Sequence, residues 1–400
     1  MRVRSACAAI LCAALLLAGL PSAAARAALV DSEPQKIIII DTDFATMLDD
    51  GQVVSMAAQL HAEGQIDLLG VTVVTGDEWR DQEVAEAVRA TERLGVGDPG
   101  PCRRVPADFA VGVYPGADYP LDHGPAAVKA DAAALATGDG FTGAWGTKKP
   151  VSRADLVAPP DGFATCARPR AQRAVDFMAD QLRAFPHEIT IVAIGPLTDL
   201  ALLAKEHPDA VGLVKRIVIM GGAFDVPGNS TAKAELNWWF DPKAADEVLK
   251  LPVEEVVTPL DLSNTVPLDD ALYRRIAFPP SPTPVTGLYR DIVGAGLDGK
   301  GGFDRDPDYT QPLWDELAFA YAVDPGFATE SRVVWPTVRA QLGENDGSVS
   351  YAPAPKPGRR PVTVITKFDN PRFDDWYVDL MTRPVPVRRQ GASRLAQGNH

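Results

Sequence analysis

Short apolar runs, each ending in polar or glycine residues and followed by a helical pattern, recur along the chain. The runs are 37–40, 68–74, 189–194, 217–220 and 256–257. Continuous apolar runs of this length are typical of strands that are buried on both faces of a sheet. Because helical segments separate them, the pattern predicts an α/β fold with a mostly parallel open sheet flanked by helices.

The polar residues that end these runs carry the candidate chemistry. In parallel α/β sheets, ligands bind outside the carboxyl ends of the strands. We therefore expect a site at the C-terminal ends of the strands of a single domain with a Rossmann-like core. That domain is predicted to span residues 28–387, with a long loop-rich insertion at 97–170 that is rich in Pro, Gly, Ala and Asp.

The two ends of the chain do not look like parts of this domain. Two arginines precede an apolar run over residues 6–20, and Ala25-Arg26-Ala27 fits a signal-peptide cleavage site. The run is too short to span a membrane, so we predict a signal peptide at 1–27 and export to the periplasm or the cell exterior. Residues 388–400 are predicted to be a disordered tail.

Charge and cysteine content narrow the partners. The formal net charge of −14 argues against nucleic acid or an anionic membrane surface and favours neutral or cationic small ligands and metal ions. Of the four cysteines, Cys102 and Cys166 remain after removal of the leader. They could form a disulfide, which export permits, or stay as two thiols. The sequence leaves a homo-oligomer open.

Four aspartates follow the first apolar run within ten residues: Asp41, Asp43, Asp49 and Asp50. Carboxylates this close repel one another unless a cation neutralises them. Oxygen-rich clusters suit a hard ion such as Ca²⁺ or Mg²⁺. The alternative is a solvated acidic loop that caps the next helix. However, the run before the loop is typical of a buried strand, and the end of such a strand should place the loop at the strand-end cleft. The cluster therefore predicts a metal site.

The segment 41–50 resembles the signature of the inosine–uridine-preferring nucleoside hydrolase family, whose usual form is Asp-x-Asp-Pro-Gly-x-Asp-Asp. Here two extra residues separate the acid pairs, and Phe44-Ala45 replaces Pro-Gly. Other segments resemble the family's later motifs in the same order. They are 192–199, 219–223, 228–229 and 235–237. The resemblance covers nearly all of the mature chain and implies hydrolysis of the N-glycosidic bond of ribonucleosides, giving free base and ribose.

The resemblance also implies a role for each candidate residue. The ligands of one Ca²⁺ would be Asp43, Asp50, Asp315 and, through its backbone carbonyl, Ile194. The residues holding the ribose would be Asp49, Asn229, Glu235 and Asn237. Asp43 would also be the general base for a water that the calcium ion binds, and Asp41 would support the loop from behind. Carboxylates near the sugar suit a reaction that develops oxocarbenium character.

Trp314, directly before Asp315, bears on the choice of base. Many family members have His-Asp here, whereas Trp-Asp is similar to the purine-specific, inosine–adenosine–guanosine-preferring subgroup. That likeness implies an indole that stacks on the purine and favours its protonation; a core tryptophan is the alternative. Asp77 and the segment 260–267 resemble the same subgroup. A second stacking aromatic has three candidates: Trp79, Tyr114 and Tyr119.

Two other function classes stay open from the sequence. A phosphatase of the haloacid dehalogenase type also begins with Asp-x-Asp after a strand, with Asp41 as nucleophile and Mg²⁺ bound, but it leaves 235–237 and 314–315 without a role. A secreted nucleoside-binding protein without activity is the other class, against which the base and the metal ligands argue. His123 and the segment 343–360 are expected on the surface.

Overall fold

The computed structural model describes residues 35–97, 109–136, 140–296, 301–343 and 346–385. The predicted signal peptide at 1–27 and the predicted tail at 388–400 lie outside these ranges and stay predictions. Within the described ranges, no helix combines the length and the apolar character that a membrane crossing requires.

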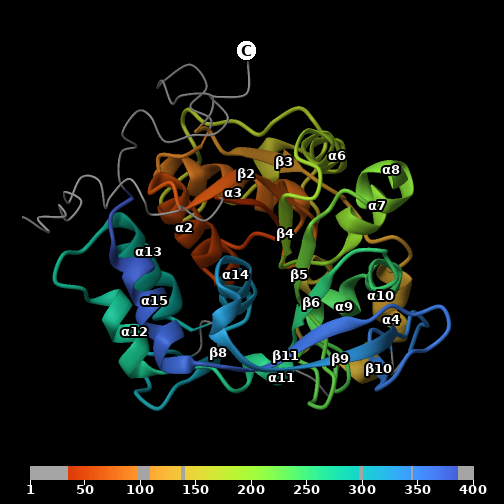
Figure 1. The fold of residues 1–400 in the computed structure, drawn as a ribbon. Helices are drawn as coiled ribbons and strands as arrows, with labels where there is room; N and C mark the ends of the chain where they lie inside the picture. The colour runs from red at the N-terminus through yellow and green to blue at the C-terminus, as the bar shows by residue number, and fades with distance from the viewer. Residues whose placement is uncertain (1–34, 98–108, 137–139, 297–300, 344–345, 386–400) are drawn as a thin grey trace, which may run out of the picture. The chain divides into compact units, whose positions relative to one another are not determined.

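A mostly parallel sheet forms the centre of the domain (Figure 1). Its first strand, β1 (Lys36–Thr42), pairs in parallel with β2 (Ile66–Val73) and with β4 (Ile189–Ala193). Among the described residues the sheet has nine strands in the order β10-β9-β11-β6-β5-β4-β1-β2-β3. The other strands are β3 (Gly112–Pro115), β5 (Arg216–Met220), β6 (Glu255–Thr258), β9 (Ala328–Val338), β10 (Val349–Ala352) and β11 (Val362–Phe368). The predicted α/β architecture is confirmed.

The isoleucines of β1 supply the cores on both faces of the sheet, because successive strand side chains point to opposite faces. Ile38 and Ile40 belong to one core, and Ile37 and Ile39 to the other. Helices packed in the first core include α2 (Asp49–Ala62), α3 (Arg80–Arg93), α12 (Asp270–Ala277), α13 (Pro284–Val293), α14 (Asp315–Val323) and α15 (Asn370–Thr382). Those in the second include α6 (Ala174–Ala184), α7 (Thr198–Glu206) and α10 (Pro242–Val248).

The order of the strands reverses beside β1, and this reversal positions the site. From β1 the chain continues to β2 on one side, and it later returns to β4 on the other side. Such a reversal opens a crevice at the carboxyl ends of the strands. The two strand ends are joined there, because the Ile194 amide donates to the Asp41 carbonyl at 2.8 Å.

The strands β9 and β10 at one edge of the sheet were not among the strands predicted from the sequence. β10 pairs antiparallel with β9 and lies within the segment 343–360, which was expected to be a surface excursion. β9 pairs antiparallel with β11. Most residues in the first half of β9 are at least partly exposed, so the strand lacks the continuous apolar run that marks the buried strands.

The segment 97–170 contains short elements among its loops. They are β3, α4 (Pro125–Ala130), α5 (Ala132–Leu135) and two 3-10 turns, η1 (Gly143–Gly146) and η2 (Arg153–Asp155). Cys166 is disulfide-bonded. Cys102 lies outside the described residues. The remaining short elements are α8 (Pro208–Val211), α9 (Leu236–Phe240), α11 (Leu260–Ser263), β7 (Pro267–Leu268), β8 (Gln311–Pro312) and η3 (Pro325–Phe327).

Candidate active site

The loop that leaves β1 is anchored at its extra residues. Phe44 and Met47 are buried in the first core, where Met47 adopts a positive φ of 58°. A left-handed backbone is uncommon outside glycine, so side-chain burial must hold Met47 in place. The amide and hydroxyl of Thr46 both donate to the Glu86 carboxylate, the amide at 2.8 Å. Two buried apolar side chains and one buried acid therefore fix the loop that the family motif closes with Pro-Gly.

Asp43 occupies a place left free by two glycines. A Cβ atom on Gly76 would lie 2.0 Å from Asp43 Oδ2, and one on Gly195 would lie 2.7 Å from the Asp43 amide nitrogen. The Asp77 amide donates to Asp43 Oδ2 at 3.1 Å. The loops after β1, β2 and β4 therefore meet around this carboxylate, as the strand-end prediction requires.

Three carboxylates converge beside Asp43. Ligand oxygens of Asp49, Asp50 and Asp315 all lie within 4.8 Å of one another. Asp49 and Asp50 open α2, and Asp315 opens α14. Helix N-termini carry partial positive charge and favour such anions. In addition, the Thr42 hydroxyl donates to Asp50. We call Asp43, Asp49, Asp50 and Asp315 the strand-end cluster.

Without a bound cation, the charged form of the strand-end cluster is unfavourable in the folded protein. Burial, followed by the charges of Asp50, Asp77 and Asp49, raises the pKa of Asp43 well above its usual range. Burial raises the pKa of Asp49 to about 6. Burial and then the Asp49 charge raise the pKa of Asp50. The charges that act on Asp315 all come from acids, and with burial they raise its pKa well above the usual range. A divalent cation would relieve this repulsion.

Two further buried acids surround the strand-end cluster, and sequence reasoning missed both. Glu83 of α3 accepts from the Glu78 amide at 2.7 Å, and burial followed by the Asp43 charge raises its pKa. Glu316 accepts from the Trp314 amide at 3.1 Å. Burial and then the Asp49 charge raise the pKa of Glu316 to about 8. These acids extend the negative potential of the site without adding a basic side chain.

The proposed ribose residues form one hydrogen-bonded group around the start of α9. Glu235 caps this helix, with Oε1 accepting from the Asn237 amide at 2.7 Å and Oε2 from the Gly222 amide at 2.9 Å. Burial raises the pKa of Glu235 to about 7, although these backbone donors oppose the shift. The Asn229 side chain accepts from the Leu236 amide at 2.9 Å.

Asn237 connects this group to the strand ends. Its side-chain amide donates to the Ile194 carbonyl at 3.1 Å. The carbonyl expected to bind calcium thus faces the site and is not used by a helix. Asp41 is fully buried behind the loop, where Thr72 Oγ1 donates to it at 2.6 Å. The supporting role given to Asp41 stays a prediction.

The loop around η1 closes one side of this group. The Ala144 amide donates to the Gly76 carbonyl at 2.8 Å, next to Asp77. The Ser230 hydroxyl donates to the Phe141 carbonyl at 3.1 Å, next to Asn229. Part of the insertion therefore bridges the loops after β2 and β5. Phe141 is half exposed and escaped the sequence analysis because it lies in a segment without periodicity.

Residues 38–375 match the family model described as inosine-uridine preferring nucleoside hydrolase. The chain belongs to this family. The match covers most of the chain, which rules out the haloacid dehalogenase-type phosphatase as its assignment. The family hydrolyses nucleosides with the help of a metal ion, and the strand-end cluster is an acidic group that could hold one.

Two related proteins carry the names of pyrimidine-specific hydrolases. The chain is 31% identical over 260 residues to the pyrimidine-specific ribonucleoside hydrolase RihA of Shewanella sp. (strain MR-4), covering 61% of this chain and 79% of that protein. It is 29% identical over 300 residues to the pyrimidine-specific ribonucleoside hydrolase RihB of Escherichia coli (strain SE11), covering 74% of this chain and 82% of that protein.

The fold is similar to solved nucleoside hydrolases. A plant nucleoside hydrolase, PpNRh1, superimposes with a TM-score of 0.67 at 22% identity, covering 88% of this chain and 100% of that one. A purine-preferring ribonucleoside hydrolase from Gardnerella vaginalis gives a TM-score of 0.64 at 22% identity, covering 86% and 98%. These likenesses establish the nucleoside hydrolase fold.

The aromatic candidates of this nucleoside hydrolase fall in different places. Trp314 is partly buried at the start of α14 and packs against the first core, and its indole N–H has no hydrogen-bond partner among the described residues. Tyr114 stacks on Phe177 at 3.6 Å between ring centroids inside the second core, so it is a packing residue. Trp79 and Tyr119 form an edge contact at 5.6 Å.

Proposed function

We propose that this nucleoside hydrolase cleaves purine ribonucleosides with a calcium ion in the strand-end cluster. The observation that carries the purine preference is Trp314, which immediately precedes the clustered carboxylate of Asp315. An indole at this point offers a flat π face beside the cleaved bond, where a histidine acid would stand in many relatives. The names of the pyrimidine-specific relatives point the other way, and this conflict makes base choice the property to measure.

The donor set supports calcium as the ion. The proposed side-chain donors are all carboxylate oxygens, from Asp43, Asp50 and Asp315, and the Ile194 carbonyl would add a neutral oxygen. The ligand oxygens of Asp50 and Asp315 lie within 4.8 Å of each other and of Asp49. Hard cations such as Ca²⁺ prefer such oxygen ligands, whereas zinc and copper favour nitrogen or sulfur. When bound, the ion would orient the attacking water and lower its pKa.

Asp43 is our candidate for the general base. Burial and the charges of Asp50, Asp77 and Asp49 raise its pKa, and a carboxylate with a raised pKa accepts a proton more readily than an ordinary aspartate. Gly76 and Gly195 leave room for one orientation of the carboxylate, and the Asp77 amide holds one oxygen. The base is therefore positioned before the substrate arrives.

Sugar recognition falls to Asp49, Asn229, Glu235 and Asn237 in this proposal. Asn229, Glu235 and Asn237 are already ordered by hydrogen bonds at the start of α9. Such preorganised carboxylate and amide groups can bind ribose hydroxyls and stabilise the positive charge that grows on the sugar. Asp77, with its backbone beside Asp43, would complete the substrate-binding side.

Steady-state rates on inosine, adenosine, guanosine, uridine and cytidine, each with and without a calcium chelator, test both parts of the proposal. We expect purine nucleosides to give the higher kcat/KM, and we expect the chelator to abolish turnover until Ca²⁺ is restored. Higher kcat/KM for uridine and cytidine would contradict the purine assignment alone. Unchanged rates in chelator would contradict the metal.

Export is a separate proposal that rests on residues 1–27 alone. Expression of the full chain in its native type of host should give a mature protein that begins near residue 28 outside the cytoplasm. Mass determination of the intact N-terminus checks this, and a chain that keeps Met1 in the cytoplasm would contradict it.

A further inference from the structure

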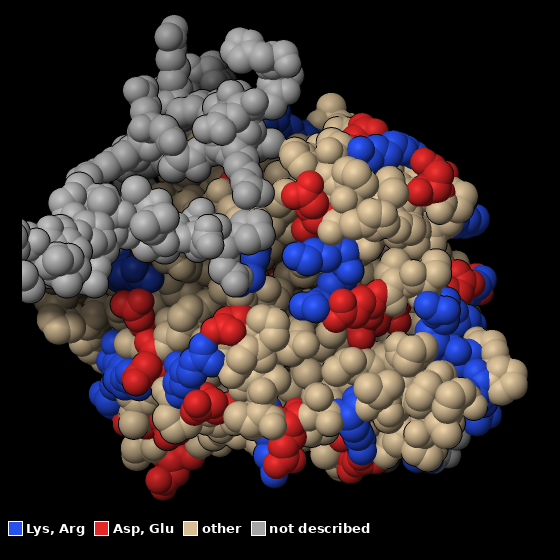
Figure 2. All heavy atoms as spheres, viewed as in Figure 1, with Lys and Arg blue, Asp and Glu red and all other residues tan. Residues whose placement is uncertain are grey.

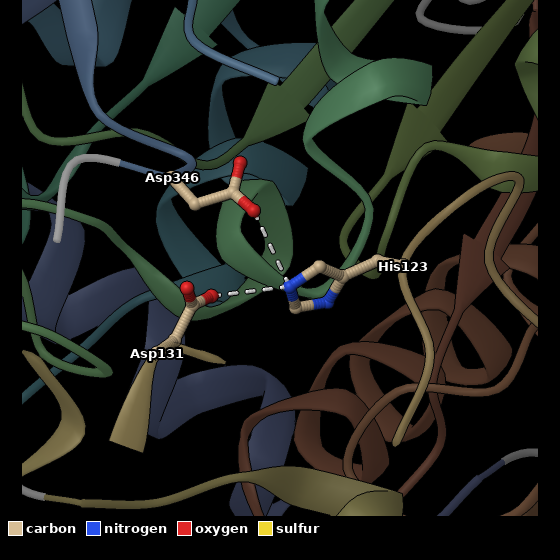
Figure 3. A group of neighbouring side chains, drawn as sticks. All are labelled: His123, Asp131 and Asp346. Atoms are coloured by element: carbon tan, nitrogen blue, oxygen red, sulfur yellow. Dashed lines mark hydrogen bonds and ion pairs between the residues drawn. The ribbon is translucent and has the colours of Figure 1, made fainter. Parts of the chain in front are cut away.

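A second cluster of possible metal ligands lies apart from the strand-end cluster. Figure 3 shows His123, Asp131 and Asp346, with the imidazole pointing between the two carboxylates. Asp131 lies between α4 and α5, and Asp346 lies between β9 and β10. The three residues are 4%, 1% and 2% exposed, which corrects the expected surface position of His123. We call them the His123 cluster.

The distances in the His123 cluster are long for hydrogen bonds. His123 Nε2 lies 3.3 Å from Asp131 Oδ2 and 3.5 Å from Asp346 Oδ2. A charge-assisted hydrogen bond between such groups would be about 2.7–2.9 Å. By contrast, a tetrahedral zinc ion with bonds of about 2.0–2.1 Å separates neighbouring ligand atoms by about 3.3 Å. These two distances are thus close to the spacing of ligand atoms around one ion, and all three ligand atoms lie within 4.8 Å of one another.

The surroundings of the His123 cluster resemble the support of a metal site. The Trp239 indole N–H donates to Asp131 Oδ2 at 3.2 Å, and the Gly343 amide donates to Asp131 Oδ1 at 2.6 Å. Outer contacts of this kind orient ligating carboxylates. Asp346 Oδ1 is buried and has no hydrogen-bond partner among the described residues. An unpaired buried carboxylate oxygen is costly, and a cation would remove that cost.

We propose that His123, Asp131 and Asp346 bind a structural zinc ion. Two carboxylates and a neutral imidazole carry two negative charges, which a divalent ion neutralises. The imidazole favours zinc over calcium, because calcium prefers oxygen ligands. A water or the second oxygen of Asp346 would complete four-fold coordination.

The ion would fasten three segments that are distant in the sequence. It would join the segment before α4, the α4–α5 junction and the connection between β9 and β10. Asp131 also contacts Trp239 of α9, the helix whose first residues follow Glu235. Zinc binding in the His123 cluster would therefore stabilise the helix that carries Asn237 and is capped by Glu235, two of the proposed ribose residues.

A third group offers a matched control. Asp176, Glu206 and His207 also bring possible ligand atoms together, but their side chains are 23–38% exposed. Arg173 pairs with both acids of this group. A cation is thus already present there, so we expect no tight zinc.

The test measures zinc in the full mature chain, purified in excess Ca²⁺ so that the all-oxygen strand-end cluster is occupied. We expect one tightly held equivalent of zinc by elemental mass spectrometry in the unaltered chain and in His207→Gln. We expect its loss in His123→Gln, together with a fall of several degrees in Tm. After exchange, Co²⁺ in the unaltered chain should show the strong visible absorption of tetrahedral ligation.

Equal zinc content in the unaltered chain and in His123→Gln would overturn the proposal. So would the absence of zinc and of a tetrahedral Co²⁺ spectrum in the unaltered chain, since the His123 cluster would then be a metal-free ion triad. If His123→Gln does not fold, Asp346→Asn keeps the volume of the side chain and should lower zinc affinity. The Co²⁺ spectrum of the unaltered chain decides the matter without any variant.

Discussion

Acidic residues of this protein lie in two contrasting environments. On the surface many of them are paired with basic side chains, and Figure 2 shows red and blue groups side by side on the face drawn. Asp161 is an example, because Arg93 Nε lies 2.7 Å from its carboxylate. Burial alone would raise the pKa of Asp161, but the charges and hydrogen bonds of Arg93 and Arg89 lower it.

The strand-end cluster has the opposite arrangement. Burial raises the pKa of all four of its carboxyl groups, and the charges of neighbouring acids raise it further at Asp43, Asp50 and Asp315. This difference between paired surface acids and unpaired buried acids indicates where the protein requires an ion. Where the chain supplies its own cation, an acid is structural; where it buries several acids without one, the missing charge must come from solution.

The largest expected effect comes from removing the proposed base. Asp43→Asn keeps the shape of the side chain and one metal-binding oxygen, but it cannot accept a proton. We expect kcat to fall by about 10²–10⁴-fold, while a ribose-containing inhibitor still binds. Steady-state kinetics with an inhibitor titration measure both quantities. The control is Asp161→Asn on the surface, which should leave kcat unchanged. Full kcat in Asp43→Asn would remove Asp43 from this role.

Removing one carboxylate of the cluster should reveal the ion through stability. We expect Asp50→Ala to bind Ca²⁺ more weakly and to lose most of the Tm increase that Ca²⁺ gives the unaltered chain, because a ligand that binds only the folded state stabilises it. Calorimetric titration and thermal melts with and without Ca²⁺ measure this. Asp49→Asn should instead weaken ribose binding. Calcium affinity equal to that of the unaltered chain would show that Asp50 is not a ligand.

Trp314 tests whether the aromatic next to the cluster serves the base. Trp314→Ala should lower kcat/KM on inosine strongly and leave p-nitrophenyl riboside nearly unaffected, because that leaving group needs no protonation. If Trp314 only packs the core, both substrates should suffer equally, and stability should fall by about 3–5 kcal/mol. Parallel assays of the two substrates, with a melting curve, separate these outcomes.

The two environments should also respond oppositely to pH, which is the smallest effect. Burial raises the pKa of Asp49, Glu235 and Glu316 to about 6, 7 and 8. A group with a raised pKa binds its proton more tightly in the folded state, so its contribution to stability is lost as pH rises through that value. In chelator, Tm should therefore fall between about pH 5 and pH 8.

Calcium provides the control for this pH series. Added Ca²⁺ should flatten the slope, since the ion stabilises the charged carboxylates. Surface acids such as Asp161 should behave in the opposite way. Burial would raise the pKa of Asp161, but Arg93 and Arg89 lower it. The stability that such an acid contributes is therefore lost only as pH falls. A Tm in chelator that rises with pH over the same range would contradict the unpaired state of the strand-end cluster.

The sequence allowed the core of the fold to be predicted, but not its C-terminal edge. The strands from β1 to β6 that flank the site appear as continuous apolar runs, except for the short β3. β9 could not be found in this way, because charged residues such as Glu330 and Arg332 lie on it and much of its first half is exposed. β9 pairs antiparallel with β10 and β11, and antiparallel strands can face water on one side, so they need not show the continuous apolar run of a buried parallel strand.

The acids that follow strands or begin helices α2 and α14 were predicted from the sequence, whereas the acids further along α3 were not. Glu83 and Glu86 lie on α3 among many charged residues, a pattern that is typical of a solvated helix. Only tertiary packing shows that both are buried. The burial of His123 could not be predicted either, because its loop has no hydrophobic periodicity. Its partner Asp346 lies more than two hundred residues away in the sequence.

The anchored loop between Asp43 and Asp49 has a consequence for finding relatives by motif. A pattern with fixed spacing and an obligatory Pro-Gly would reject this chain, although Phe44, Met47 and the Thr46–Glu86 hydrogen bonds hold the lengthened loop in place. Glu86 lies forty residues further along the chain than the residue it restrains. A search that allows a variable gap and asks for an acid on the following helix should recover family members that strict signatures discard.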